Sequence, residues 1–181
     1  MKQVLIMLVM VLGLVSCKSP EARPPESVKS GSFIKASVER NKKLNEAEYA
    51  KIQTIINKNP DIDYIASENG FWYYYKQRLQ QDTIQPRFGD QINFSYNVAD
   101  LNGNMIYSKE QLGDQDYVME KEELFTGLRE GLKLMKPTEQ VTFIFPSQTA
   151  FGYYGDDNKI GTNVPLICEV TLNTITQNNN D

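Results

Sequence analysis

The sequence predicts an α+β fold in which a curved antiparallel β-sheet wraps one short α-helix, with a further helix on the N-terminal side. Three observations predict it. From residue 70 onward, apolar residues recur with the two-residue period of strands. Asn-Gly-Asn at residues 102–104 favours a tight hairpin, which joins antiparallel neighbours. Only residues 120–135 interrupt the strands with a helical pattern, and such a surplus of strands over helices is typical of α+β folds.

Alternation of side chains along the predicted strands indicates which faces are buried. It is clearest at residues 91–100, where apolar side chains fall on one face and polar ones on the other. In the segment 139–146, alternation places Phe143 and Phe145 in the core. The helix at 120–135 begins with acidic residues, as the helix dipole favours. The remaining predicted strands are residues 70–78, 105–108 and 163–175.

A helical pattern also precedes the sheet, within the segment 44–69. Asn45 is a suitable N-cap, Glu48 completes a pattern like a capping box, and Pro60 stops the helix. We expect its apolar face to dock on the main domain, and dimerisation through this helix is the alternative. That face consists of Tyr49, Ile52 and Ile56, with Ile55 beside them.

Residues 1–16 predict a lipoprotein signal peptide. Residues 4–15, after Lys2, carry no polar side chain, and this run is too short for a membrane span of about 20 residues. The following Leu-Val-Ser-Cys resembles a bacterial lipobox, which implies cleavage before Cys17 and lipidation of Cys17. The alternative is a plain signal peptide followed by a chance cysteine.

Residues 17–43 are expected to form the lipidated cysteine and a flexible tether, because three prolines and mixed charge fill residues 18–31. The main domain is expected at residues 70–176, followed by a polar tail at 177–181. The protein would then be lipid-anchored in the cell envelope and face the periplasm. Lys18 and Ser19 do not supply the aspartate that signals inner-membrane retention, which favours the outer membrane.

Composition excludes several classes of function. A net charge of −4 and a pI of about 5.0 argue against binding to nucleic acid, which requires a basic surface. The chain has no histidine, which excludes His-based triads and the usual zinc sites. No metal or other cofactor is expected. Cys168 is predicted to be a small buried hydrophobic residue, and lipidation of Cys17 would exclude an internal disulfide.

The stretch Phe-Gly-Tyr-Tyr-Gly at residues 151–155 places three aromatic rings on a glycine-punctuated loop after a predicted strand. These rings either cover the core or form the wall of a pocket for a flat apolar group. Tyr153 and Tyr154 fit a pocket rim or a contact with a partner equally well. The next residues, 156–158, are acidic and polar, but they lack the spacing of a calcium loop and therefore predict a turn.

Three stretches resemble the FK506-binding-protein (FKBP) type of peptidyl-prolyl isomerase in order and spacing: "FGDQINFSYNVADLNGNMIYS", "FTGLREGLKLMKPTEQVTFIFPSQTAFGYYG" and "IGTNVPLICEVTLNTI". The resemblance covers residues 88–175, and the segment 70–78 looks like the strand that precedes them. With the lipobox, tether and leading helix, the chain also resembles the gliding-motility-associated peptidyl-prolyl isomerase lipoproteins.

The resemblance implies a prolyl isomerase that assists the folding of exported or envelope proteins, without a cofactor and with proline-containing polypeptides as clients. An apolar cup would receive the proline ring, and the backbone N–H of Phe125 would hold the substrate carbonyl. Carried over position by position, the catalytic residues are Tyr96, Phe125 and Phe151, and the substrate-binding residues are Ile106, Tyr107, Leu124, Leu128, Ile160 and Cys168.

The chain departs from the family pattern at five of these positions. Tyr107 replaces an aspartate, Leu128 replaces a tryptophan floor, and Phe151 lacks the hydroxyl of the usual tyrosine. Cys168 and Ile106 each replace a phenylalanine. The changes keep the cup apolar but alter its depth and polar groups, which bears on efficiency and on affinity for FK506. The alternative function is a non-catalytic chaperone or binding module that uses the same cup, and a structural part in motility is a third possibility.

Overall fold

The computed structural model describes residues 30–81 and 83–178. The chain divides into two units, Met1–Ser37 and Val38–Asp181. The first unit is described only from residue 30, where it consists of the first turns of a helix. The second holds the entire sheet. The predicted signal peptide, Cys17, the first part of the tether and the last three residues of the tail lie outside the described residues.

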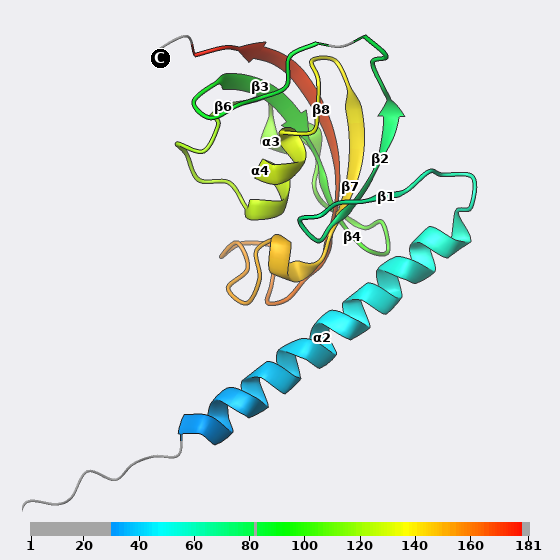
Figure 1. The fold of residues 1–181 in the computed structure, drawn as a ribbon, viewed down its shortest axis with the longest axis vertical. Helices are drawn as coiled ribbons and strands as arrows, with labels where there is room; N and C mark the ends of the chain where they lie inside the picture. Colours follow the sequence, from blue (N-terminus) through cyan, green and yellow to red (C-terminus); the bar gives the residue numbers. More distant parts are fainter. Residues whose placement is uncertain (1–29, 82, 179–181) are drawn as a thin grey trace, which may run out of the picture. The chain divides into compact units, whose positions relative to one another are not determined.

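One antiparallel sheet of eight strands forms the body of the second unit (Figure 1). Its main path is β1-β2-β7-β8-β3-β6, and β4 pairs with both β5 and β8. The longest strand, β8, pairs with three others and is the centre of the sheet. The strands are β1 Ile65–Ala66, β2 Trp72–Gln77, β3 Gln91–Tyr96, β4 Val98–Asp100, β5 Met105–Tyr107, β6 Gln115–Val118, β7 Gln140–Phe145 and β8 Leu166–Thr176.

The predicted α+β fold and the predicted hairpin are both confirmed. Strands β4 and β5 pair antiparallel around the turn at residues 101–104. Gly103 there has a φ of +84°, which glycine adopts without strain. The Asp100 carboxylate accepts hydrogen bonds from the backbone N–H groups of Asn102 and Asn104, at 2.8 and 2.9 Å.

Several short elements were not predicted, because they are too short to show a period. They are strands β1 and β6, the one-turn helix α3 and a 3-10 turn that follows β7. Helix α3 spans Lys109–Leu112 and is capped by Ser108. The 3-10 turn spans Ser147–Thr149 and leads into the aromatic loop.

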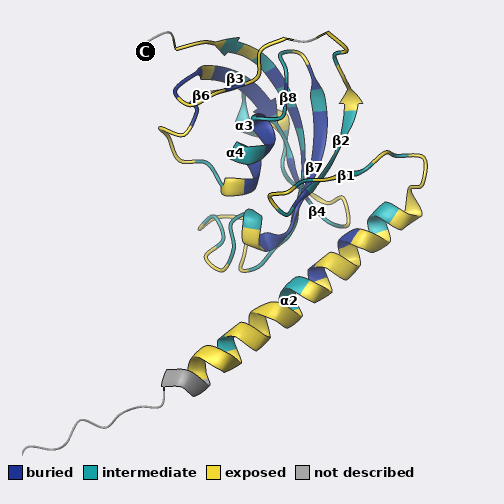
Figure 2. Ribbon diagram, in the orientation of Figure 1, coloured by how far each residue is buried: buried dark blue, intermediate teal, exposed yellow. Residues whose placement is uncertain are grey.

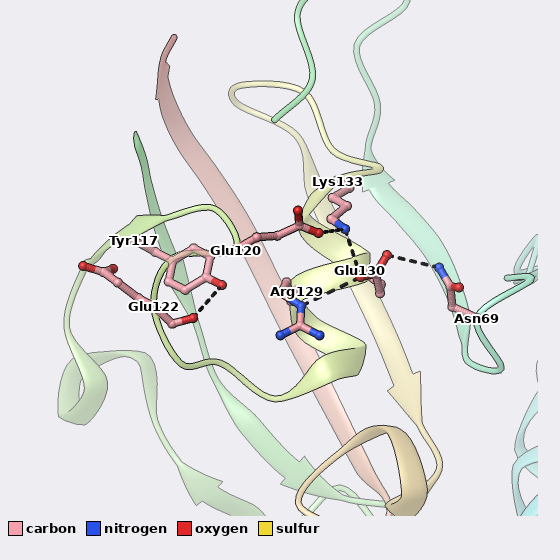
Figure 3. A network of polar contacts seen from close by, with 7 residues as sticks. All are labelled: Asn69, Tyr117, Glu120, Glu122, Arg129, Glu130 and Lys133. Atoms are coloured by element: carbon pink, nitrogen blue, oxygen red, sulfur yellow. Dashed lines mark hydrogen bonds and ion pairs between the residues drawn. The ribbon is translucent and has the colours of Figure 1, made fainter. Parts of the chain in front are cut away.

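Helix α4 spans only Thr126–Leu132, so the predicted extent of 120–135 is wrong at both ends. Glu120 has a left-handed backbone with a φ of +61°, and Phe125 is extended at the N-cap. The acidic side chains of this segment bond outside the helix instead. Figure 3 shows the Glu120 carboxylate accepting from the ammonium of Lys133. The Glu122 carboxylate accepts from the backbone N–H of Val118 at 2.9 Å, and its backbone carbonyl accepts from the Tyr117 hydroxyl at 3.1 Å. These bonds hold the chain in an irregular path up to the start of α4.

The buried face of α4 includes Leu128, Leu132 and two glycines, and the glycines lie directly on β7. A Cβ atom on Gly127 would lie 2.5 Å from Cδ1 of Phe145, and one on Gly131 would lie 2.8 Å from Cε1 of Phe143. Both rings are fully buried, which confirms their predicted place in the core, and Figure 2 shows α4 largely as buried ribbon. The helix therefore approaches the sheet more closely than any residue with a side chain allows.

Helix α2 includes Ser30–Lys58, so the prediction of a flexible tether is wrong for residues 30–43, and Asn45 is not an N-cap. The physical reason is the absence of helix breakers, since no proline or glycine occurs between Gly31 and Pro60. The helix ends at Lys58, before Pro60, as predicted. No helix in the described part of the chain, α2 included, is both long enough and apolar enough to cross a membrane.

The C-terminal part of α2 docks on the rest of the second unit through one face, as predicted. Ile52 is fully buried, and the ring of Tyr49 packs edge-on against Trp72 with centroids 5.3 Å apart. The Glu48 carboxylate, 3% exposed, accepts hydrogen bonds from the backbone N–H of Ser147 at 2.8 Å and from its hydroxyl at 2.7 Å. Glu48 thus joins α2 to the turn that precedes the aromatic loop, in place of the predicted capping box.

Replacing Gly127 with alanine is expected to destabilise the protein by about 1–3 kcal/mol, because the Phe145 ring and the Thr149 carbonyl, 2.8 Å from the new Cβ, would have to move. The measurement is urea unfolding of both proteins. Gly161→Ala is the matched control, since a Cβ there meets nothing within 4 Å. Equal losses in the two variants would contradict the close packing of α4 on β7.

Candidate functional site

The structure gathers every predicted site residue except Cys17, which lies outside the described residues, into one hydrophobic cluster. The cluster has a buried interior and a partly exposed surface. Leu128, Ile160 and Cys168 lie in its interior, at most 3% exposed. The partly buried members are Tyr96, Ile106, Tyr107, Leu124, Phe125 and Phe151.

These residues come from elements that are far apart in the sequence. Tyr96 ends β3, Ile106 and Tyr107 lie in β5, and Phe125 is the N-cap of α4. Phe151 follows the 3-10 turn at the end of β7. Sheet pairing and the seating of α4 bring them together. Six of the nine residues keep part of their side chains exposed, while Leu128, Ile160 and Cys168 are buried within the same cluster.

Phe125 presents both a ring and a backbone donor. Its ring centroid lies 5.0 Å from that of Phe151 and 5.3 Å from that of Phe145, so one side faces the aromatic loop and the other rests on the core. Within residues 30–81 and 83–178, its backbone N–H donates to no acceptor, because it precedes the first hydrogen-bonded turn of α4. This pairing of an apolar wall with an uncommitted amide suits a peptide carbonyl next to a bulky ring.

Tyr96 supplies a neutral hydroxyl to the same surface. Burial, with Cys168 and Tyr107 nearby, raises the pKa of Tyr96 to about 12. The hydroxyl therefore keeps its proton throughout the physiological range and remains a hydrogen-bond donor. Burial also raises the pKa of the Cys168 thiol, so Cys168 is an unreactive packing residue, as predicted.

Tyr107, which stands where the family has aspartate, ties down the loop that follows the aromatic stretch. Its hydroxyl donates to the Asp156 carboxylate and accepts from the backbone N–H of Lys159 at 3.3 Å. The other oxygen of Asp156 accepts from the backbone N–H groups of Asn158 at 3.0 Å and Ile160 at 2.7 Å. This confirms turn chemistry for residues 156–158. The Tyr107 contact, 49 residues apart in sequence, had no signal in the sequence.

The same hydrogen bonds shift both pKa values. The bond to Asp156 and burial raise the pKa of Tyr107 above its usual 10.0. Burial alone would raise the pKa of Asp156, but the Tyr107 hydroxyl and three backbone amides together hold it below its usual 3.8. The pair is therefore in its bonded form, hydroxyl to carboxylate, across the neutral range.

Glycine is required where the aromatic loop turns back. Gly155 has a φ of +73°, and a Cβ there would lie 2.1 Å from the carbonyl oxygen of Ile160. Ile160 in turn accepts from the backbone N–H of Asp156 at 3.0 Å. The loop thus closes on itself between Phe151 and Ile160, two residues of the candidate site.

Comparison with known proteins defines the class. Residues 82–173 match the family of FKBP-type peptidyl-prolyl cis-trans isomerases, and this is just over half of the chain. The chain therefore belongs to this family.

Individual relatives agree with this assignment. A probable FKBP-type peptidyl-prolyl cis-trans isomerase FkpA of Neisseria meningitidis is 26% identical over 136 residues, which is 75% of this chain. The chain spans about half, 49%, of the length of that curated relative.

Two solved structures share the fold. FkpA from Escherichia coli aligns with a TM-score of 0.60 at 19% identity, covering 97% of this chain and 82% of its own. A peptidyl-prolyl cis-trans isomerase from Pseudomonas syringae aligns with a TM-score of 0.60 at 16% identity, covering 75% of this chain and 96% of its own.

Replacing Tyr107 with phenylalanine is expected to destabilise the protein most near neutral pH. The contribution of Asp156 is complete above pH 3.8 and is lost as pH falls through its lowered pKa. The contribution of Tyr107 is complete below pH 10.0 and is lost as pH rises through its raised pKa. The stability difference between the two proteins should therefore narrow at both extremes.

Urea unfolding across that pH range measures this difference. Tyr154→Phe, on a side chain 86% exposed, is the control and should show no such dependence. A difference that stays constant from pH 3 to pH 11 would rule out the hydroxyl–carboxylate bond as its cause.

Proposed function

We propose that the chain is a peptidyl-prolyl cis-trans isomerase that assists the folding of exported or envelope proteins. The observation that carries the proposal is the placement of the uncommitted Phe125 amide beside the Phe125–Phe151 ring pair, on the partly exposed surface of one apolar cluster. Family membership supports it.

The reaction is rotation about an X–Pro bond, whose barrier is about 18–20 kcal/mol and whose uncatalysed half-time is tens to hundreds of seconds. It requires no covalent intermediate and no proton transfer. Phe125 and Phe151 would hold the proline ring, and the Phe125 N–H would donate a hydrogen bond to the substrate carbonyl. The twisted amide at the transition state is less dipolar than the planar amide, so an apolar surface that excludes water favours it.

The alternative is a binding module that grips proline-containing segments without turnover. Tyr107 and Phe151 favour it, because Tyr107 replaces the family aspartate and Phe151 lacks the hydroxyl that the family offers at its position. The neutral Tyr96 hydroxyl, which donates to no residue in the described part of the chain, favours the isomerase because a polar donor remains available at the cup.

Phe151→Ala and Phe125→Ala are each expected to reduce catalysis at least about tenfold, since each removes a wall that positions the proline ring. The measurement is refolding of a model protein limited by a slow prolyl step, with catalytic amounts of the purified chain. Phe88→Ala is the matched control, because this phenylalanine is 67% exposed and lies outside the cluster. A well-folded wild-type chain that binds the client but does not accelerate refolding would establish the binding module instead.

We also propose that the protein is a lipoprotein of the outer membrane that faces the periplasm, and that it takes part in gliding motility. Support for the anchor comes from the sequence alone: the apolar run before Cys17, the lipobox-like Leu-Val-Ser-Cys and the absence of aspartate after the cysteine. The motility role rests on the resemblance of the chain to the gliding-motility-associated isomerase lipoproteins. A lipidated Cys17 would place the isomerase domain beside newly exported polypeptides.

Cys17→Ser is expected to abolish incorporation of labelled palmitate and to move the protein from the outer-membrane fraction to the soluble fraction. In a deletion strain of a gliding host, the same variant should fail to restore gliding if anchoring and motility are linked. Unchanged fractionation of Cys17→Ser would refute the anchor, and normal gliding of the deletion strain would refute the motility role.

A further inference from the structure

A groove lies between α2 and the aromatic loop, next to the candidate site but outside it. All of its lining belongs to the second unit, Val38–Asp181, and its volume is about 780 Å³. That volume is within the range of ligand pockets, about 300–1,000 Å³. One wall includes Asn41 and Leu44 of α2, and the other includes Gly152, Tyr153 and Asn163.

The groove and the proline site share one loop. Phe151 faces the cluster and contacts Phe125, whereas the next two residues, Gly152 and Tyr153, line the groove. Backbone hydrogen bonds fix this division: the Gly152 N–H donates to the Ser147 carbonyl at 2.9 Å, and the Asn163 N–H donates to the Gly152 carbonyl at 2.8 Å. An extended peptide advances about 3.3–3.6 Å per residue, so residues near a bound proline reach the groove within a few positions.

The lining suits an extended polypeptide. Side-chain amides both donate and accept, as each residue of a peptide backbone does. The amides of Asn41 and Asn163 make no hydrogen bond to another residue in the described part of the chain. Between them, Leu44 and the ring of Tyr153 offer apolar surface for alternate side chains. Tyr153 is 71% exposed, so its ring is available for contact.

The two walls of the groove are joined by buried bonds, so the groove is formed before a ligand arrives. The Glu48 carboxylate of α2 holds both the backbone N–H and the hydroxyl of Ser147. An exposed hydrogen bond also joins the walls, from the side-chain amide of Asn45 to that of Gln148 at 3.0 Å. Because a buried carboxylate is costly to leave without partners, α2 and the aromatic loop are held together.

We propose that this groove binds the stretch of client polypeptide that flanks the isomerised proline. The inference rests on the proposed function and deepens it: the cup selects proline, and the groove selects and holds an extended segment beside it. Helix α2 lies outside residues 82–173, which match the family model, so one wall of this subsite comes from outside the matched domain.

The test compares two substrates. A tetrapeptide with one proline occupies the cup alone, whereas a peptide of about twelve residues with the same central sequence extends to about 40 Å and reaches the groove. Tyr153→Ala is expected to raise KM for the long peptide about five- to tenfold, with the tetrapeptide changed less than about twofold. Asn41→Ala, on the opposite wall, is expected to raise KM for the long peptide alone, by about twofold or more.

Phe88→Ala is the control, because Phe88 is 67% exposed, lies outside both the groove lining and the hydrophobic cluster, and should leave KM for both substrates unchanged. If Tyr153→Ala raised KM equally for the tetrapeptide and the long peptide, Tyr153 would belong to the cup and the proposal would be overturned. The proposal would also be overturned if neither Tyr153→Ala nor Asn41→Ala raised KM for the long peptide.

Failure of the isomerase proposal would be visible separately, as a wild-type chain that does not isomerise the tetrapeptide. The groove is then judged by fluorescence anisotropy with the long peptide in which alanine replaces proline. Weaker binding by Tyr153→Ala than by Phe88→Ala would support the groove without catalysis, and equal binding by the two variants would overturn it.

Discussion

The close approach of α4 to β7 is the contact on which the rest of the structure depends. Gly127 and Gly131 lie against Phe145 and Phe143 at a distance that leaves no room for a Cβ atom. This contact fixes the start of α4 relative to the sheet, and with it the backbone N–H of Phe125. Phe145 also packs edge-on against the Phe125 ring. One side chain of β7 therefore seats the helix and supports the wall of the candidate site.

Hydrogen bonds hold the loops that do not take part in this packing. Tyr107 binds Asp156 and so fixes the turn that leads to Ile160. Where the family has an aspartate in the cup, this chain has Tyr107, whose hydroxyl holds a loop instead. Groups that are fixed in place before a ligand arrives lose less entropy on binding.

Helix α2 adds a second layer to this arrangement. Through Glu48 and Ser147 it holds the turn that precedes Phe151, although it lies outside the region that matches the family. On the proposals above, the family domain supplies the chemistry and α2 supplies the second wall of a client groove. The exposed Tyr153 and Tyr154 then differ in role, because only Tyr153 lines that groove.

The sequence by itself determined the fold class, the 102–104 hairpin, the burial of Phe143 and Phe145 and the set of residues that gather in one cluster. The first three features follow from period and turn chemistry, each readable within a short segment, whereas the cluster residues follow from the resemblance of residues 88–175 to the family. The true extent of α4 and the ties of Tyr107 and Glu48 were decided by tertiary structure alone. A polar side chain binds whichever partner the closed sheet brings within about 3 Å, and that partner can lie anywhere in the chain.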